Sequence, residues 1–532
     1  MLARLRKRRL LWLGSALLGV LALTGGVALY LVSSEPGDVV NSDVPFIETP
    51  AATTTTPPAP TPPADAQRPA PFTWPVYGYD KARTRYLPLA EPLRPPFAER
   101  WKLGGSVLLE FPPAMGGRSL YLLKNNAALY AISRTTGRVR WKRKFGALAA
   151  AQPAYADGVV YFVVLERGKG IKQGRAVAVH AGSGRTKWSR KLPSRAESSP
   201  LLHEGTLSFG TEDGTVYGLR ASDGMTRWRY RAGDAVKGGL ALDGDKLYFG
   251  DYAGRVHAIR ARTGQGVWTT GTSGGRFGLA SGNFYSTAAV AYGRVYLGNT
   301  DGFVYSFATR DGALAWRRKT GAFVYGSPAV ATVPGGRPTV YIGSYDERFY
   351  ALDARSGSVR WSRRAEGRIS GGATILGDLV FYSTLAKTTT AVGARTGQVV
   401  WRTRRGAFNP VVSDGRGIFL VGMTSLFGLD GRPGRSTRGG AAPTQSVASR
   451  TAARRRSLDR RVARKQAARR RALERRVAAR RAAVRSRRAL IASGVLWCSG
   501  TGKRRVCRRP APLVCLEGAD GRTVCRARVR RG

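Results

Sequence analysis

Four cysteines, Cys498, Cys507, Cys515 and Cys525, are the side chains best suited to covalent chemistry in this chain of 532 residues. They are separated by eight, seven and nine residues, which does not match the short C-x2-C knuckles of zinc sites. In an oxidising compartment they allow three disulfide pairings. Each half of the set has an apolar residue and a cysteine, a Gly-bearing turn, and then Val-Cys-Arg, as in a hairpin. This pattern favours the pairs Cys498–Cys507 and Cys515–Cys525, with a zinc site as the alternative.

The three histidines are interpreted as structural. His180 stands at a turn, His203 lies in a hairpin, and His257 occupies a strand position where sibling segments have Tyr. Gly-rich strings such as residues 182–187 are turns rather than phosphate-binding loops, because no helix follows them. The sequence therefore predicts no catalytic, cofactor-binding or metal-binding residues.

One motif recurs in seven complete copies through the middle of the chain. Each copy has an Ala, Gly or Ser, then a Gly six residues later, then a Trp four residues after that Gly. The residue before the Gly is always Thr, Ser or Asp, which can bond the turn backbone, and the Gly supplies the positive φ. The turn glycines are Gly137, Gly184, Gly224, Gly264, Gly312, Gly357 and Gly397. The Trp residues after them are Trp141, Trp188, Trp228, Trp268, Trp316, Trp361 and Trp401.

The spacing and the ends of this repeat predict the fold. A period of about 40–50 residues filled with short strands is typical of β-propeller blades. An eighth motif at 425–434 lacks its Trp, whereas Trp101 has no motif before it. The strand of Trp101 must therefore complete the blade that ends near Asp430, which closes the ring and leaves no exposed sheet edge. We predict that residues 72–434 form an all-β, eight-bladed propeller of four-stranded antiparallel blades, and that Trp74, outside the register, contributes less to stability.

The repeats resemble the tryptophan-docking motif of the PQQ-type propellers, A-x-D-x-x-T-G-x-x-x-W. The resemblance covers about residues 72–434, and residues 74–86 are similar to the segment that often opens such propellers. It implies that each Trp stacks on the Gly of the next motif and belts the blades together. The Asp of the motif is kept only at Asp353 and Asp430.

The family includes quinone-dependent alcohol dehydrogenases and the non-catalytic lipoprotein of the outer-membrane β-barrel assembly machine, so the motif specifies fold better than function. The dehydrogenases need a calcium cluster, a catalytic Asp and typically an adjacent Cys pair over the cofactor. Residues 72–434 contain no Cys, and no carboxylate–Asn constellation stands out. We therefore expect no cofactor and no enzymatic activity, with PQQ and calcium as the alternative.

The N-terminal residues predict a membrane anchor. Residues 10–32 are uncharged and long enough to cross a bilayer. Five basic residues in the segment 1–9 precede them and acidic residues follow, which orients the N-terminus to the cytoplasm and the propeller outside it. We expect an uncleaved single-pass signal-anchor in the cell membrane; a cleaved signal peptide and a buried core helix are the alternatives. The Pro/Thr-rich linker 33–71 is expected to be a spacer, reaching on the order of 100 Å when extended.

The charge of the chain is concentrated behind the propeller. The chain carries 88 basic and 33 acidic residues, a net charge of +55, and residues 435–532 alone hold 30 basic and four acidic ones. A linker (435–449) leads to an Arg/Ala-rich segment (450–495) that we expect to be helical, followed by Cys-containing basic hairpins (496–532). Three hypotheses stand for the segment 450–495: a helix that docks on anionic lipid or cell-wall polymer, a solvated disordered tail, or a coiled-coil dimer.

These features together predict a non-catalytic, membrane-anchored extracytoplasmic propeller that acts as a protein-binding scaffold in the cell envelope. Its basic tail would bind anionic surfaces. Two alternatives from other classes are a PQQ-dependent dehydrogenase and a polyanion or nucleic-acid binder that acts through the tail.

Overall fold

The computed structural model describes residues 37–48, 72–166, 173–272 and 282–433, together with four short strands between Trp497 and Ala527. Strands and turns make up these residues, and none of them lies in a helix that could span a membrane. The predicted span 10–32 and the predicted helix 450–495 lie outside the described residues. The chain divides into two units, Met1–Arg435 and Ser436–Gly532.

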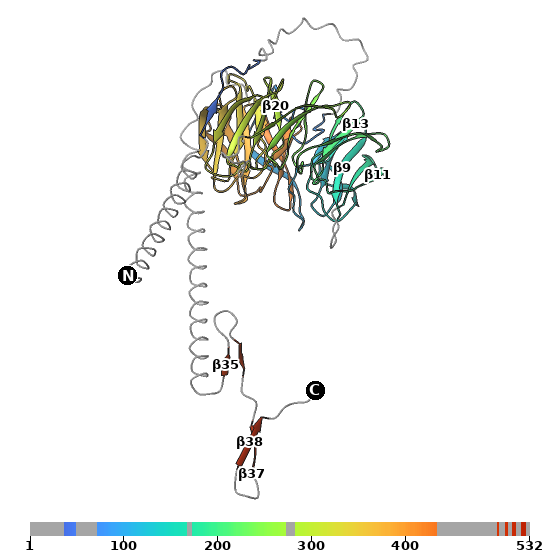
Figure 1. Cartoon of the computed structure of the whole chain (residues 1–532), viewed down its shortest axis with the longest axis vertical. Coiled ribbons are helices and arrows are strands. Elements are labelled where there is room, and N and C mark those ends of the chain that lie inside the picture. Colours follow the sequence, from blue (N-terminus) through green and yellow to red (C-terminus); the bar gives the residue numbers. More distant parts are fainter. Residues whose placement is uncertain are drawn as a thin grey trace, which may run out of the picture. The chain divides into compact units, whose positions relative to one another are not determined.

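Eight antiparallel sheets in the first unit form the blades of a propeller, as predicted (Figure 1). Blades 1 to 7 run in chain order from the innermost to the outermost strand. Blade 1 contains β4 (Ala114–Gly116), β5 (Ser119–Leu123), β6 (Ala128–Ser133) and β7 (Val139–Lys144). Blade 2 contains β8 (Ala154–Ala156), β9 (Val159–Leu165), β10 (Gly174–His180) and β11 (Thr186–Leu192). Blade 3 contains β12 (Leu201–His203), β13 (Thr206–Gly210), β14 (Thr215–Arg220) and β15 (Thr226–Arg231).

The next four blades repeat the plan. Blade 4 contains β16 (Ala241–Asp243), β17 (Lys246–Gly250), β18 (Arg255–Arg260) and β19 (Gly266–Gly271). Blade 5 contains β20 (Ala289–Ala291), β21 (Arg294–Gly298), β22 (Phe303–Ala308) and β23 (Leu314–Lys319). Blade 6 contains β24 (Ala329–Ala331), β25 (Thr339–Gly343), β26 (Arg348–Asp353) and β27 (Val359–Arg364). Blade 7 contains β28 (Thr374–Leu376), β29 (Leu379–Thr384), β30 (Thr388–Gly393) and β31 (Val399–Thr403).

Blade 8 combines both ends of the propeller sequence. It contains β32 (Val411–Ser413), β33 (Gly417–Val421) and β34 (Leu426–Pro433), and its outermost strand is β3 (Leu93–Leu103). Strand β3 runs antiparallel to β34, with Trp101 opposite Gly428. The predicted closure of the ring by the Trp101 strand is therefore confirmed.

Burial follows the position of each strand within its blade. The second strands are buried along all or nearly all of their length, as in β13, because a blade is covered on both faces by its neighbours. The outermost strand β15 alternates exposed side chains with half-buried or buried ones. The sequence of each copy therefore reads as an apolar run followed by an amphipathic one.

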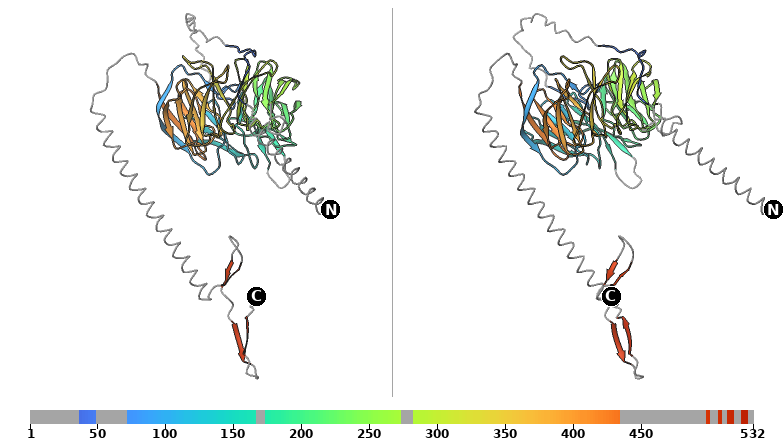
Figure 2. Two further views of the ribbon diagram at one scale, coloured as in Figure 1. Left: turned by 60° about the vertical axis from the view of Figure 1, so that its left-hand side comes forward. Right: turned by 90° about the vertical axis from the view of Figure 1, so that its left-hand side faces the viewer.

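Two short strands extend the four-stranded plan. Strand β2 (Tyr86–Leu87) lies parallel to β28 at the hub, and β1 (Val39–Val40) pairs with β23 at the outer edge of blade 5. Figure 2 shows the segment that carries β1, in dark blue, against the propeller. Residues 37–48 belong to the linker 33–71 of the sequence interpretation, yet they lie on the propeller instead of acting as a free spacer.

The second unit contains two hairpins among its described strands. Strand β35 (Trp497–Ser499) pairs with β36 (Val506–Arg508), and β37 (Leu513–Glu517) pairs with β38 (Thr523–Ala527). Their registers place Cys498 opposite Cys507 and Cys515 opposite Cys525. This is the backbone arrangement that the two predicted disulfides require, and the disulfides themselves remain a prediction.

Candidate functional site

The motif Trp residues dock on the next blade. The indole of Trp316 is completely buried, and a Cβ added to Gly357 would lie 2.6 Å from its ring. Its Nε1 donates a hydrogen bond of 3.0 Å to the carbonyl of Ala354. The same contact with the next turn glycine is made by Trp101, Trp141, Trp188, Trp228, Trp268 and Trp361, on Gly137, Gly184, Gly224, Gly264, Gly312 and Gly397. These residues therefore hold the blades together and are not available for ligand chemistry.

The eighth interface includes an aromatic residue of the closing strand. Trp401 packs edge-on against Phe97 of β3, with ring centroids 5.2 Å apart, and Phe97 lies against Gly431. The turn glycine of the eighth motif, Gly434, lies outside the described residues. The repeat pattern could not reveal the contact of Phe97, because Phe97 precedes the first motif.

The histidines occupy separate places. His180 is exposed and His203 is half-buried, whereas His257 is 2% exposed. The Nε2 of His257 lies 3.0 Å from a carboxylate oxygen of the buried Asp251, and its Nδ1 lies 3.0 Å from the Tyr230 hydroxyl. This closed network between blades 3 and 4 agrees with a structural role for His257.

The opening segment, residues 74–87, forms a plug across the hub. Its backbone bonds to six blades, through Trp74–Met115, Tyr155–Pro75, Leu242–Lys81, Val290–Ala82, Val330–Thr84 and Ile375–Arg85. Two side chains reach the remaining blades, since Arg83 bonds to Ser199 of the connection into blade 3 and Tyr77 to Asn409 of the connection into blade 8. The plug therefore contacts all eight blades. Trp74, which the sequence placed outside the register, is only 1% exposed.

Arg83 is the central residue of the plug. Its guanidinium is fully buried and donates to the carbonyls of Leu240 at 2.8 Å, Tyr77 at 2.5 Å and Ser199 at 3.1 Å. The backbone of Arg83 has φ +60°, a left-handed conformation that an L-residue adopts at a cost. Hydrogen bonds from several blades hold this conformation, so the plug and the ring stabilise each other.

A small cavity of about 40 Å³ lies on the propeller axis beside the plug. The connection that leads into each innermost strand contributes to its lining, and Tyr77 of the plug lines it as well. The connections are represented by Glu110, Ala150, Glu197, Lys237, Tyr285, Tyr325, Ser370 and Phe408. A convergence of eight loops on one axis makes this the candidate functional site.

A charge cluster stands at one side of this site. The Nζ of Lys237 lies 3.4 Å from the Glu197 carboxylate and 3.2 Å from that of Glu212. Burial raises the pKa of Glu197 to about 7, and the neighbouring Glu212 adds to the rise. Although burial opposes it, hydrogen bonding to Glu197 and the charge of Lys237 hold the pKa of Glu212 below its usual value. The charge of the cluster therefore changes near neutral pH.

An aromatic arc (Tyr252, Tyr285, Tyr325, Tyr345 and Phe323) extends from the site across blades 4 to 6. Its ring centroids lie 6.3 Å apart for Tyr252 and Tyr285, 5.9 Å for Tyr285 and Tyr325, and 4.9 Å for Tyr325 and Tyr345. The four tyrosines are half-buried, and Phe323 is 51% exposed. The sequence did not indicate the arc, because its members come from two interblade connections and from turns within blades 4 and 6. A Tyr stands four residues before the innermost strand in both blade 5 (Tyr285) and blade 6 (Tyr325). This shared position was the sequence feature that could have indicated the arc.

The axial site does not fit the quinone cofactor of the family's dehydrogenases. Sites for ligands of this size occupy roughly 300–1,000 Å³, far more than the cavity beside the plug. Within the parts of the chain that the structure describes, no three His, Cys, Asp or Glu side chains lie together as a metal site would require.

Comparisons with known proteins identify the family. The family model described as outer membrane protein assembly factor BamB matches residues 94–234, 170–299 and 300–481, whereas no curated protein matches the chain. Similar solved structures include quinohemoprotein alcohol dehydrogenase ADHIIG from Pseudomonas putida HK5, with 15% identity, a TM-score of 0.57, and 71% of this chain and 82% of that chain covered. BamB from Moraxella catarrhalis has 17% identity and a TM-score of 0.51, over 63% of this chain and 99% of that chain. A europium-containing methanol dehydrogenase has 14% identity and a TM-score of 0.55, over 68% and 98%. At these identities the similarity to the solved structures shows a shared fold. Because the family model spans most of the sequence, this chain belongs to the BamB family of PQQ-type propellers.

Proposed function

We propose that the protein is a non-catalytic propeller, anchored in the cell membrane by residues 10–32, that binds a partner protein outside the cytoplasm. The aromatic arc beside the axial cavity carries this proposal. Half-exposed tyrosines next to charged groups are typical of protein interfaces, because they bury apolar area and still form hydrogen bonds. The match to an assembly factor of the outer membrane supports a role in protein assembly within the envelope.

The binding surface consists of the arc and the charge cluster at one end of it. Lys237 lies 5.4 Å from the ring centre of Tyr252, and the guanidinium of Arg368 lies 5.9 Å from that of Tyr345. Arg368 therefore places a basic group at the Tyr345 end of the row, whereas Lys237 at the Tyr252 end is paired with the Glu197 and Glu212 carboxylates. This arrangement suits a partner segment that has apolar side chains with an acidic side chain at one end.

Substitution within the arc tests the proposal. In the full-length protein in its native membrane, Tyr325→Ala should abolish proximity labelling of a partner that the unaltered protein labels. Met225→Ala is the control, because Met225 is an apolar residue that is 55% exposed on a turn of blade 3. Loss of the same partner in the Met225 variant, or its retention in the Tyr325 variant, would contradict the proposed surface.

The second candidate function is a PQQ-dependent dehydrogenase, which the similarity to the two dehydrogenase structures favours. The size of the axial cavity argues against it. Incubation with PQQ and calcium, followed by absorbance and dye-linked alcohol oxidation, distinguishes the candidates. Cofactor binding with turnover would replace the scaffold proposal.

The basic tail adds a proposed second contact. Its 30 basic residues against four acidic ones suit anionic lipid or cell-wall polymer, with nucleic acid as the alternative. Binding of the full chain and of a chain that ends at residue 434, measured against each polyanion, would identify the preferred surface.

A further inference from the structure

Residues 37–48 form a strap that fastens the N-terminal part of the chain to blade 5. In its first half, β1 continues the sheet of blade 5, with Val39 opposite Arg317 and Val40 opposite Trp316. The backbone N–H of Asn41 donates to the carbonyl of Ala315 at 2.7 Å. An ion pair between Asp38 and Arg318 holds the beginning of the strap.

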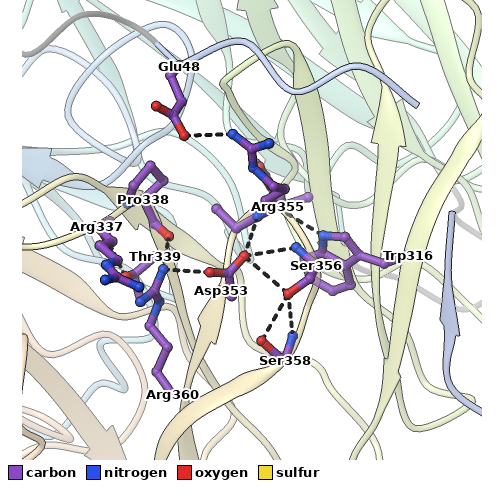
Figure 3. A network of polar contacts seen from close by, with 12 residues as sticks. Glu48, Trp316, Arg337, Pro338, Thr339, Asp353, Arg355, Ser356, Ser358 and Arg360 are labelled. Atoms are coloured by element: carbon purple, nitrogen blue, oxygen red, sulfur yellow. Dashed lines mark hydrogen bonds and ion pairs between the residues drawn. The ribbon is translucent and has the colours of Figure 1, made fainter. Parts of the chain in front are cut away.

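The second half of the strap packs on residues of blades 5 and 6. Val44 is 7% exposed, and the ring of Phe46 stacks on Tyr292 at a centroid distance of 5.3 Å. The guanidinium of Arg355 lies 4.9 Å from the ring centre of Phe46 and also donates to the Glu48 carboxylate at 2.7 Å. Figure 3 shows Glu48 and Arg355 in this contact, above the network in which Asp353 accepts a hydrogen bond from Arg360.

The side chains that capture the strap are particular to blade 5. The buried Arg294 donates to the carbonyls of Val44 and Pro45, at 2.5 and 2.8 Å. Arg317, which is 8% exposed, donates to the carbonyl of Gly37 at 2.9 Å. The positions equivalent to Arg294 and Arg317 are Lys246 and Thr269 in blade 4, and Thr339 and Ser362 in blade 6. Of these three blades, only blade 5 has an Arg at both positions. The side chains that bind the strap are therefore specific to the outer edge of blade 5.

The strap begins very close to the proposed membrane span. Four residues separate Val32, the last of the span, from Gly37, and a fully extended chain covers about 18 Å over these five residue-to-residue steps. The tether between membrane and propeller is therefore much shorter than the extended linker expected from the sequence. Because β1 is at the outer edge of blade 5, the short tether limits the distance between the membrane and that rim of the ring. It does not set the same limit for the centre of the ring.

We propose that the propeller is held with the rim of blade 5 against the surface of the bilayer, a conclusion that rests on the proposed membrane span. The strap itself presents apolar side chains that could enter the headgroup region, since Val40 is 56% and Ile47 is 61% exposed. In a ring of eight blades, blade 1 is opposite blade 5 and is directed away from the membrane. The axial site then opens sideways, along the membrane, toward partners that are themselves in the bilayer.

Energy transfer to the membrane tests this orientation. The full-length protein is placed in vesicles of phosphatidylcholine and phosphatidylglycerol that contain a headgroup-labelled acceptor lipid. A fluorescent amino acid replaces either Arg310 in blade 5 or Thr135 in blade 1, which are both exposed and stand two residues before the turn glycines Gly312 and Gly137. We expect greater transfer from position 310 than from position 135. Equal transfer, or greater transfer from position 135, would overturn the orientation.

A variant that releases the strap provides the second arm. Asp38→Arg with Val44→Asp removes the ion pair and the buried apolar contact, and should abolish the difference in transfer while the protein still floats with the vesicles. The matched control is Glu91→Arg at an exposed loop position, which should keep the difference. Failure of the unaltered protein to float would reject the membrane span and the orientation together. Flotation with equal transfer would reject the orientation alone.

Discussion

Trp101 stands directly opposite Gly428 in the sheet that closes the propeller, although the two residues come from opposite ends of the propeller sequence. A Cβ added at Gly428 would lie 2.3 Å from the Trp101 ring, so no other residue fits there without displacement. The indole also donates to the carbonyl of Arg134 in blade 1 at 3.0 Å. One side chain thus joins the last blade internally and fastens it to the first.

The closure of the ring predicts the effect of Gly428→Ala. Overpacking against Trp101 should lower the free energy of unfolding by about 1–3 kcal/mol. Gly182→Ala is the control, because an added Cβ there meets no atom within 4 Å. Denaturant unfolding of both variants checks this, and equal midpoints would contradict the closure contact.

A chain that starts at Gly105 lacks β3, and it should aggregate through the exposed edge of β34.

Burial of Trp74 reverses an expectation from the sequence. Since Trp74 is 1% exposed and hydrogen-bonded through its backbone to Met115, Trp74→Ala should cost about 3–5 kcal/mol, at least as much as Trp268→Ala. Thermal and denaturant unfolding of the two variants measure the difference. A clearly smaller loss for Trp74→Ala would mean that the plug contributes little to the stability of the ring.

Glu197→Gln should change how stability depends on pH. Burial raises the pKa of Glu197 from 4.5 to about 7, so its contribution to stability is fully present below about pH 4.5 and is lost as the pH rises through 7. The variant should therefore gain stability relative to the unaltered protein over this interval, by at most about 3 kcal/mol. Unfolding free energies at pH 4.5 and 8 measure the gain, with the exposed Glu91→Gln as control. Parallel curves for the unaltered protein and Glu197→Gln would argue against a buried carboxyl at this position.

Salt should control binding by the basic tail. With 30 basic residues against four acidic ones, it should bind anionic vesicles through many contacts, and its affinity should fall steeply with ionic strength. Neutralising the Arg side chains should also raise helicity in residues 450–495, because like-charge repulsion opposes that helix. Co-sedimentation and circular dichroism at increasing salt measure both effects. Salt-insensitive binding, or equal binding to neutral vesicles, would instead indicate a protein-recognition module.

The predicted disulfides of the tail should be dispensable for this attraction. Reduction should loosen the hairpins of residues 497–527 without abolishing vesicle binding, since attraction requires charge and not their fold. Loss of binding on reduction would show that the hairpins form a shaped site.

The blades and their closure could be predicted from the sequence alone. The Gly–Trp repeat encodes local turns and a regular interblade contact, and the offset between Trp101 and the eighth motif fixes which strand completes the ring. These features are periodic, so they can be counted along the chain. The opposed registers of Cys498 with Cys507 and of Cys515 with Cys525 likewise follow from local hairpin patterns.

Features that depend on contacts between distant segments could be recognised only in the folded structure. The aromatic arc forms because interblade connections and turns of blades 4 to 6, far apart in the sequence, lie side by side near one axis. Nothing in any single connection marks Tyr285 or Tyr325 as part of a group. The buried positions of Trp74 and Arg83 depend on the hub that surrounds the plug. The strap resembles a spacer in composition, yet it is ordered because Arg294 and Arg317 supply buried donors to its carbonyls, a complementarity that one strand alone cannot reveal.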